Sequence, residues 1–158
     1  MVNDKIRKQV KDEFTEYLTL RKHRKTSERY AILDHIYSID GHFDMDSLYH
    51  SMLKSGFRVS RSTLYNTIEL LLDCSLVVKH QFGANAAQYE RAYGNENHDH
   101  IICVDCGEVR ETQNNLISEA QLKKIRRFKV SYYSMYIYGV CSKCSHARRM
   151  KLNRLRRK

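Results

Sequence analysis

Apolar residues recur every three or four positions over the first half of the chain, a spacing typical of amphipathic helices. The spacing predicts a first helix over 5–22 and a second helix that Ser27 caps. A third helix is expected to open at Asp44 or Asp46, and Ser60 is expected to cap a fourth. The fourth helix has a polar start and an apolar second half, so its first turn should project outward while the rest packs inside.

Alternating apolar and polar residues follow the fourth helix and predict a β-hairpin. Its strands are expected at 76–82 and 88–93, with a turn at 83–85. Helices followed by a hairpin are typical of the winged helix, whose last helix enters the major groove of DNA. We therefore expect a winged-helix DNA-binding domain over 1–93.

A second domain is expected after a polar hinge at 94–97. Its pattern predicts two short strands, a helix and a long strand, over 101–104, 109–111, 115–127 and 130–138. The two faces of the long strand carry Tyr132, Tyr136 and Tyr138 on one side, and Tyr133, Met135 and Ile137 on the other. Both faces are apolar enough to bury, one against the helix and one against a second subunit. The expected fold class is α+β, with a small α/β dimerisation domain at 98–146. The basic tail at 147–158 either contacts DNA or is a disordered end with no specific role, and the second interpretation is favoured.

Composition narrows the class of partner. The chain has 158 residues and a formal net charge of +10, an excess that favours nucleic acid through counterion release. No apolar run approaches the roughly 20 residues that a membrane span needs, so no membrane partner is expected. The charged start of the chain does not resemble a signal peptide, which predicts a cytoplasmic protein. Paired cysteines then indicate metal rather than disulfides.

Four of the five cysteines form two Cys-x-x-Cys pairs, Cys103 with Cys106 and Cys141 with Cys144. Each short turn can aim both sulfurs at one ion, so two turns provide the tetrahedral coordination of a structural zinc. The competing interpretations are disulfides, a redox pair and an iron–sulfur centre. The remaining cysteine, Cys74, is expected to be a small buried side chain at a helix end.

A second set of candidate metal ligands consists of imidazoles and carboxylates. On a strand, His98 and His100 point to the same side and can bind one ion. Glu90, His42 and Glu111 can supply further ligands, from the hairpin, the first domain and the sheet respectively. Such a site would make the relative angle of the domains depend on metal, as a regulatory switch does. A metal hydrolase is the competing hypothesis, but no catalytic motif is present and we expect no enzyme.

Candidate DNA contacts lie at the polar start of the fourth helix. Arginine and asparagine can bond base edges, tyrosine can pack on a thymine methyl, and hydroxyls suit phosphates. The candidates are Arg61, Ser62, Thr63, Tyr65 and Asn66, with Arg24 and Lys25 for the DNA backbone or minor groove.

With these motifs, the chain resembles the ferric uptake regulator (Fur) family of metal-responsive repressors. The resemblance is carried by Ser60-x-x-Thr63-Leu64-Tyr65, Tyr89-Glu90, His98-Asp99-His100-x-x-Cys103-x-x-Cys106-Gly107 and Tyr138-Gly139-x-Cys141-x-x-Cys144. It implies a homodimer that binds an AT-rich palindromic operator in double-stranded DNA. It also implies zinc on the four cysteines, and a regulatory ion on His42, Glu90, His98, His100 and Glu111.

The chain departs from the family pattern at several positions. Asn66 stands where many members have arginine, Ser27 where proline is usual, and Gln88 where arginine is usual. Asn97 and Tyr133 replace two histidines of a third metal site, which should therefore be missing. Imidazole and carboxylate ligands suit Fe(II) or Mn(II), so iron sensing ranks first, peroxide sensing second and zinc sensing third. A zinc-containing adaptor that binds nucleic acid without sensing is the alternative from another class.

Overall fold

The computed structural model describes residues 3–81, 87–94, 98–112, 117–128 and 133–155. The chain divides into two compact units, Met1–Asn95 and Glu96–Lys158, which are described separately below. Among the described residues, no helix has both the length and the apolar character needed to cross a membrane.

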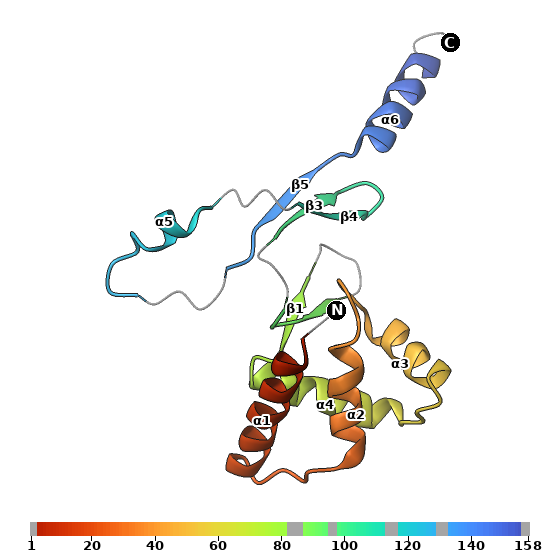
Figure 1. The fold of residues 1–158 in the computed structure, drawn as a ribbon. Helices are drawn as coiled ribbons and strands as arrows, with labels where there is room; N and C mark the ends of the chain where they lie inside the picture. Colours follow the sequence, from red (N-terminus) through yellow and green to blue (C-terminus); the bar gives the residue numbers. More distant parts are fainter. Residues whose placement is uncertain (1–2, 82–86, 95–97, 113–116, 129–132, 156–158) are drawn as a thin grey trace. The chain divides into compact units, whose positions relative to one another are not determined.

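The first unit contains four helices and a two-stranded hairpin (Figure 1). Its elements are α1 (Asp4–Leu20), α2 (Ser27–Ile36), α3 (Met45–Lys54), α4 (Arg61–Asp73), β1 (Val77–His80) and β2 (Gln88–Arg91). The strands are antiparallel, and Val77 pairs with Arg91 while His80 pairs with Gln88. The winged-helix order of elements expected from the sequence is therefore present, and the expected hairpin turn lies outside the described residues.

Side-chain caps fix where three of these helices begin, and the Asn3 side chain caps α1 by accepting from the Lys5 amide at 3.0 Å. The carboxylate of Asp44 accepts a bond from the amide of Ser47 at 2.8 Å, and the Ser47 hydroxyl accepts from the amide of Asp44, which forms a capping box. The Ser60 hydroxyl accepts from the Thr63 amide at 3.0 Å and so caps α4 as expected. At α2 the expectation was one residue off, because Thr26 is the N-cap and makes no side-chain cap bond.

The hydrophobic core of the described chain lies in the first unit. The fully buried side chains of α1, α2, α3 and α4 meet there, namely Phe14, Leu18, Ile32, Leu33, Ile36, Leu48, Met52, Leu64, Ile68 and Leu71. The ring of Tyr37 is also buried, and its hydroxyl donates to the carbonyl of Leu76 at 2.8 Å. This bond ties the end of α2 to the start of the hairpin, so the hairpin is fixed relative to the helices.

The second unit is built on a three-stranded sheet with strand order β4-β3-β5. Its elements are β3 (Asp99–Cys103), β4 (Val109–Thr112), α5 (Glu119–Leu122), β5 (Tyr136–Gly139) and α6 (Ser142–Leu155). Strand β4 is antiparallel to β3, whereas β5 is parallel to it. Helix α6 runs through the boundary expected between domain and tail, so residues 147–155 are helical.

Two sequence expectations for the second unit were wrong in extent. The helix expected over 115–127 is only the four-residue α5, and residues 115 and 116 of that range lie outside the described part. Periodicity predicts a helix only where its apolar face can be buried, but Ile125 is 48% exposed and Phe128 is 69% exposed. The strand expected over 130–138 begins at Tyr136, although residues 129–132 are not described.

Candidate functional site

The four paired cysteines converge at one end of the sheet in the second unit. Their sulfur atoms all lie within 4.8 Å of one another, and the Sγ atoms of Cys106 and Cys141 are 3.9 Å apart. Zinc–sulfur bonds of about 2.3 Å in a tetrahedron place neighbouring sulfurs roughly 3.8 Å apart. The spacing of the thiols therefore fits a tetrahedral cation of this size. In the described chain all five cysteines are free thiols, which favours the metal interpretation over the disulfide one.

Backbone turns position these sulfurs. Cys103 ends β3, and the amide of Gly107 donates to the Cys103 carbonyl at 2.9 Å, which closes the first Cys-x-x-Cys turn. Gly107 has a φ of 72°, a left-handed conformation that favours glycine. The second pair lies at the start of α6, where the Cys141 sulfur accepts from the Cys144 amide at 3.5 Å. Cys141 thus acts as an N-cap for α6.

Hydrogen bonds also bias the protonation of the cluster. Backbone amides, first that of Cys141 and then that of Cys106, donate to the Cys103 sulfur and lower its pKa to about 6. The pKa of Cys144 is raised to about 12, because its thiol donates to the sulfurs of Cys141 and Cys106. Hydrogen bonding within the cluster thus favours the thiolate form of Cys103 and the thiol form of Cys144.

In the first unit, His42 and Glu90 are brought together by an isolated β-bridge. The amide of Phe43 donates to the Tyr89 carbonyl at 2.9 Å, and the amide of Tyr89 donates back to the Phe43 carbonyl at 2.7 Å. Each candidate ligand is the sequence neighbour of a bridging residue. As a result, Nε2 of His42 lies 3.8 Å from Oε2 of Glu90.

A third ligand-type side chain, His80, joins this pair and was missed at the sequence level. Its Nε2 atom lies 2.7 Å from Oε1 of Glu90, and its ring centroid lies 5.3 Å from that of His42. The His80 side chain is only 1% exposed and that of Glu90 is 10% exposed. The signal that identifies His80 is the alternation of the hairpin, since residues 80 and 90 lie on the same face of paired strands.

In the second unit, His98 and His100 lie at the start of β3, with ring centroids 4.7 Å apart. Glu111 on β4 is directly opposite His100 in the antiparallel register, and Tyr136 on β5 flanks His100 on its other side. His100 is buried, whereas Glu111 is exposed. The sheet thus gathers two imidazoles and a carboxylate, the oxygen and nitrogen donors that suit Fe(II), Mn(II) or Zn(II).

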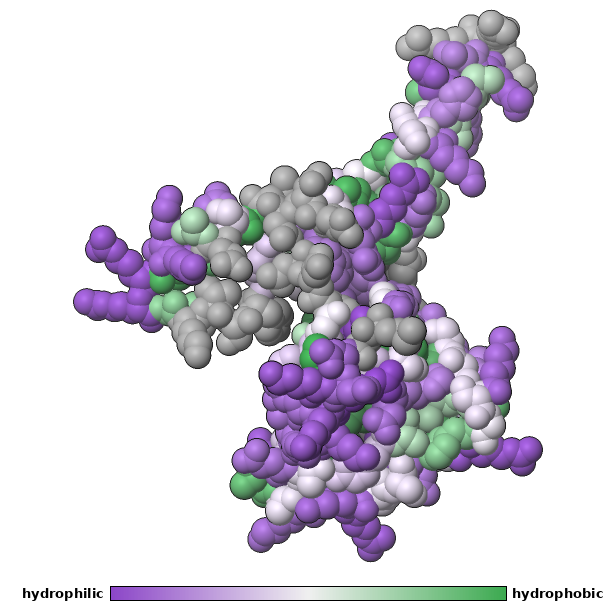
Figure 2. Space-filling model, viewed as in Figure 1, coloured by the Kyte–Doolittle hydropathy of each residue, from purple (hydrophilic) through white to green (hydrophobic). Residues whose placement is uncertain are grey.

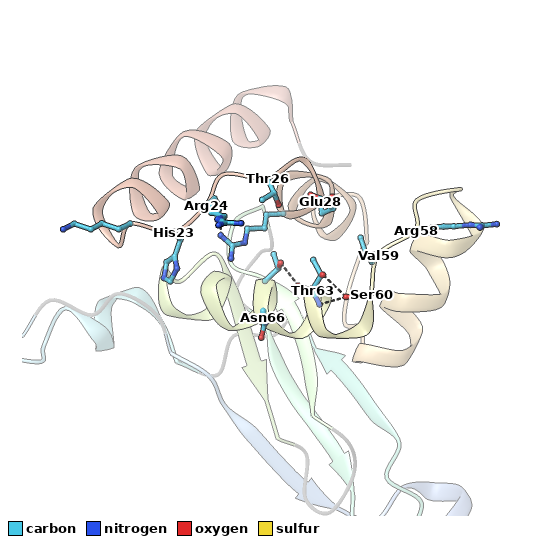
Figure 3. Close-up of a pocket in the computed structure, with 12 residues that line it drawn as sticks. His23, Arg24, Thr26, Glu28, Arg58, Val59, Ser60, Thr63 and Asn66 are labelled. Carbon is cyan, nitrogen blue, oxygen red and sulfur yellow. Dashed lines mark hydrogen bonds between the residues drawn. The ribbon is translucent and has the colours of Figure 1, made fainter.

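The start of α4 adjoins a basic pocket of about 590 Å³ within the first unit (Figure 3). Thr63 and Asn66 line it from α4, and Arg24 lines it from the segment between α1 and α2. Its cations are Lys22, Arg24, Arg29 and Arg58, against one carboxylate, Glu28. A pocket with this charge and several hydroxyl and amide groups suits a phosphate of the DNA backbone. Arg29 and Arg58 were not among the sequence candidates.

The remaining DNA candidates lie around the same helix start. Ser62 and Asn66 are exposed, and the Tyr65 ring is 48% exposed. Arg61 forms an ion pair with Asp46 of α3, and its guanidinium lies 4.5 Å from the centre of the Tyr49 ring. Lys25 is exposed beside Arg24. The structure therefore gathers Arg24, Thr63 and Asn66 in the pocket and holds Arg61 by contacts within the protein.

Comparison with known proteins identifies the family. Residues 21–138 match the model of the Ferric uptake regulator family. The Ferric uptake regulation protein of Campylobacter jejuni is 33% identical over 125 residues, which span 77% of this chain and 79% of that protein. The Haemophilus influenzae protein of the same name is 33% identical over 107 residues, 66% of this chain and 73% of that protein.

Solved structures agree in fold. The ferric uptake regulator of Pseudomonas aeruginosa with manganese has a TM-score of 0.63 and 26% identity, and the match covers 81% of this chain and 97% of that one. The ferric uptake regulator of Helicobacter pylori has a TM-score of 0.68 at 20% identity, covering 88% and 93%. These matches confirm the α+β fold class expected from the sequence. The chain therefore belongs to the ferric uptake regulator family, whose members are metal-responsive, DNA-binding transcriptional regulators and not enzymes.

Proposed function

We propose that this protein is a cytoplasmic, dimeric repressor that binds a double-stranded DNA operator when it holds a regulatory Fe(II) ion. The observation that supports the proposal most strongly is the convergence of His42 and Glu90 in the unit that carries α4. Glu90 lies on β2, which pairs with β1, and β1 begins four residues after α4 ends. The proposed metal ligands His42 and Glu90 and the proposed DNA-contacting helix α4 thus lie in the same folded unit.

The proposed regulatory ligands are His42 and Glu90 from the first unit and His98, His100 and Glu111 from the second. When bound, the ion would supply a link between ligands on both units. His80 would hold the Glu90 carboxylate in place by donating from Nε2 at 2.7 Å, so that Glu90 is oriented before the ion arrives. A fixed carboxylate loses little conformational freedom on binding, which favours affinity.

The proposed structural ion is zinc on Cys103, Cys106, Cys141 and Cys144. The 3.9 Å separation of two of these sulfurs supports this assignment, as does the lowered pKa of Cys103. A cation held by four thiolates has no position left for another ligand, which suits a structural role rather than an exchangeable one.

Iron is the proposed signal for two reasons. The regulatory donors are nitrogen and oxygen atoms without a thiol, which suits Fe(II) or Mn(II) more than a zinc-selective site. The relatives from Campylobacter jejuni and Haemophilus influenzae are named for ferric uptake regulation. One structural neighbour, with 30% identity and a TM-score of 0.54, is a zinc-bound manganese uptake regulator. Manganese and zinc are therefore the alternatives to test, together with peroxide sensing through the bound metal.

The second unit supports the proposed dimer. Its sheet exposes apolar side chains that a monomer would leave in water, including Ile101 at 41%, Val104 at 59% and Tyr138 at 51%. Strand β5 pairs with β3, and among the described strands it stands at the edge of the sheet. Exposed apolar side chains and a sheet edge in the same small unit are features that subunit pairing covers.

The test is a titration of DNA binding with Fe(II), Mn(II) and Zn(II), using protein whose cysteine-bound zinc is retained and measured. The proposal predicts that Fe(II) or Mn(II) raises affinity for operator DNA and that a chelator too weak to remove the zinc reverses this. The variant His98→Ala should stay folded and lose the response. Unchanged affinity after removal of every exchangeable ion would instead support the non-sensing adaptor.

A further inference from the structure

Helix α6 carries Cys144 near its start, but the proposed zinc site gives no role to its basic side chains. It spans fourteen residues, and none of them is buried. Five of them are cations, namely Lys143, Arg148, Arg149, Lys151 and Arg154. From residue 142 to the end of the chain there is no Asp or Glu, and three more cations follow the helix. In Figure 2, α6 shows mostly hydrophilic side chains with isolated hydrophobic ones between them.

The start of α6 is anchored to the cysteine cluster. The Cys141 sulfur caps the helix by accepting from the Cys144 amide, and Arg148 forms an ion pair with Asp105 in the turn between Cys103 and Cys106. Beyond that turn, Lys151 and Arg154 have no carboxylate partner among the described residues. The helix is therefore positioned at one end, while the cations of its second half face solvent.

The arrangement of charge around α6 indicates which partner it fits. At 3.6 residues per turn, Arg149 and Lys151 lie on nearly opposite sides of the helix, and so do Met150 and Leu152. A helix that binds a membrane surface needs one continuous apolar face, which this pattern lacks. Like charges three and four residues apart repel each other, and a polyanion relieves that repulsion. Phosphates along a DNA backbone match cations spread around a helix.

We propose that α6 is a second DNA-binding element, which contacts backbone phosphates and adds affinity without reading sequence. This inference rests on DNA binding through the first unit, as proposed above. Because each neutralised phosphate releases condensed counterions, the contribution of α6 should appear in the salt dependence of binding. Base discrimination should remain with α4.

The experiment compares the full-length protein with the triple variant R149Q/K151Q/R154Q, with Mn(II) present. Glutamine is nearly as good a helix former as arginine and lysine, so α6 should persist. Binding to a mixed-sequence duplex is measured over a range of salt concentrations. If all three cations contact phosphates, the slope of log K against log salt should fall by up to about 2.7, at roughly 0.9 per phosphate. Affinity for any specific duplex should fall by the same factor as affinity for the mixed-sequence one.

The matched control is K123Q/K124Q/R126Q, which removes three exposed cations from the same unit and gives the same net charge. Its slope should match that of the unchanged protein. Equal slopes for all three proteins, or equal losses in both variants, would overturn the proposal. A changed oligomeric state in R149Q/K151Q/R154Q, or a loss confined to anionic phosphatidylserine vesicles, would assign α6 to subunit or membrane contact instead.

The variant R24Q distinguishes failure of this inference from failure of the proposed function. If R24Q weakens DNA binding while R149Q/K151Q/R154Q does not, α6 has no role in DNA binding and the first unit still has one. If the unchanged protein binds no duplex with or without metal, the proposed function itself fails.

Discussion

Removal of one of the four proposed zinc ligands should unfold the second unit and leave the first unit folded. The substitution Cys106→Ser is the cleanest perturbation, because the Cys106 side chain is exposed and its loss opens no cavity. The buried apolar residues described in the second unit are Ile102 and Cys103. The first unit, by contrast, buries apolar side chains from four helices and the hairpin.

If the four cysteines hold zinc as proposed, the ion is the main source of the second unit's free energy of folding. Full burial of one isoleucine side chain contributes about 1.5–3 kcal/mol. Zinc binding to a folded set of thiolates contributes about 10–16 kcal/mol near neutral pH. Loss of the ion therefore removes several times more free energy than the described apolar core supplies. The second unit of the variant should be unfolded at 25 °C.

The assay is far-ultraviolet circular dichroism with a parallel measurement of zinc content. Helices α1 to α4 have 17, 10, 10 and 13 residues, whereas α5 has 4 and α6 has 14. Loss of α5 and α6 should reduce the helical signal by about a quarter, and the remainder should melt in one cooperative transition. The variant should also elute as a monomer.

The control is Cys74→Ser, which changes the one cysteine outside the cluster and should retain both zinc and the full signal. A Cys106→Ser protein that keeps its helical signal and its dimer after zinc has been lost would refute the reasoning. So would a variant whose first unit unfolds together with the second, because the two units would then share their stability.

Three further predictions follow from individual residues. His80→Leu should weaken Mn(II) binding by about 10- to 100-fold, measured by electron paramagnetic resonance. His80→Gln should retain most of the affinity for Mn(II), because its amide can still donate to Glu90. Equal losses in both variants would contradict an orienting role for His80. Burial raises the pKa of Cys74 to about 11, so about one Cys74 thiol in a thousand is ionised at pH 8. The rate at which Cys74 of the folded protein is alkylated should therefore rise roughly tenfold per pH unit up to pH 10. A rate that levels off below pH 9 would contradict this. Phe14→Ala should destabilise the first unit by about 3–5 kcal/mol in urea denaturation, because this fully buried ring leaves a cavity; a loss below 1 kcal/mol would show that the core collapses around it.

Features set by local sequence were predictable. The N-cap at Ser60 and the two Cys-x-x-Cys turns depend on residues within three positions of one another, and each forms as expected. The winged-helix order of elements was also predictable, because the first unit has enough apolar residues for helical periodicity to correspond to real burial.

Features that depend on contacts between distant parts of the sequence were not predictable. The extents of α5 and β5 were overestimated because their apolar positions have too little core to pack against, as the exposure of Phe128 shows. His80 was overlooked because its significance depends on the strand register that places it beside Glu90. The pocket cations Arg29 and Arg58 lie in separate segments, and folding alone brings them to the start of α4.

The buried apolar side chains lie mostly in the first unit, which affects the order in which the two units of the nascent chain can fold. The amino-terminal unit leaves the ribosome first and carries its own core, so it can fold before any metal arrives. If the four cysteines hold zinc as proposed, the carboxy-terminal unit can fold only after zinc binds, and the sheet proposed to join two subunits forms only then. Under the proposed assignment, a cell starved of zinc would accumulate monomers that possess a DNA reader but cannot pair. Iron would then be sensed only in cells that have already met their zinc requirement, which makes one nutrient a precondition for responding to another.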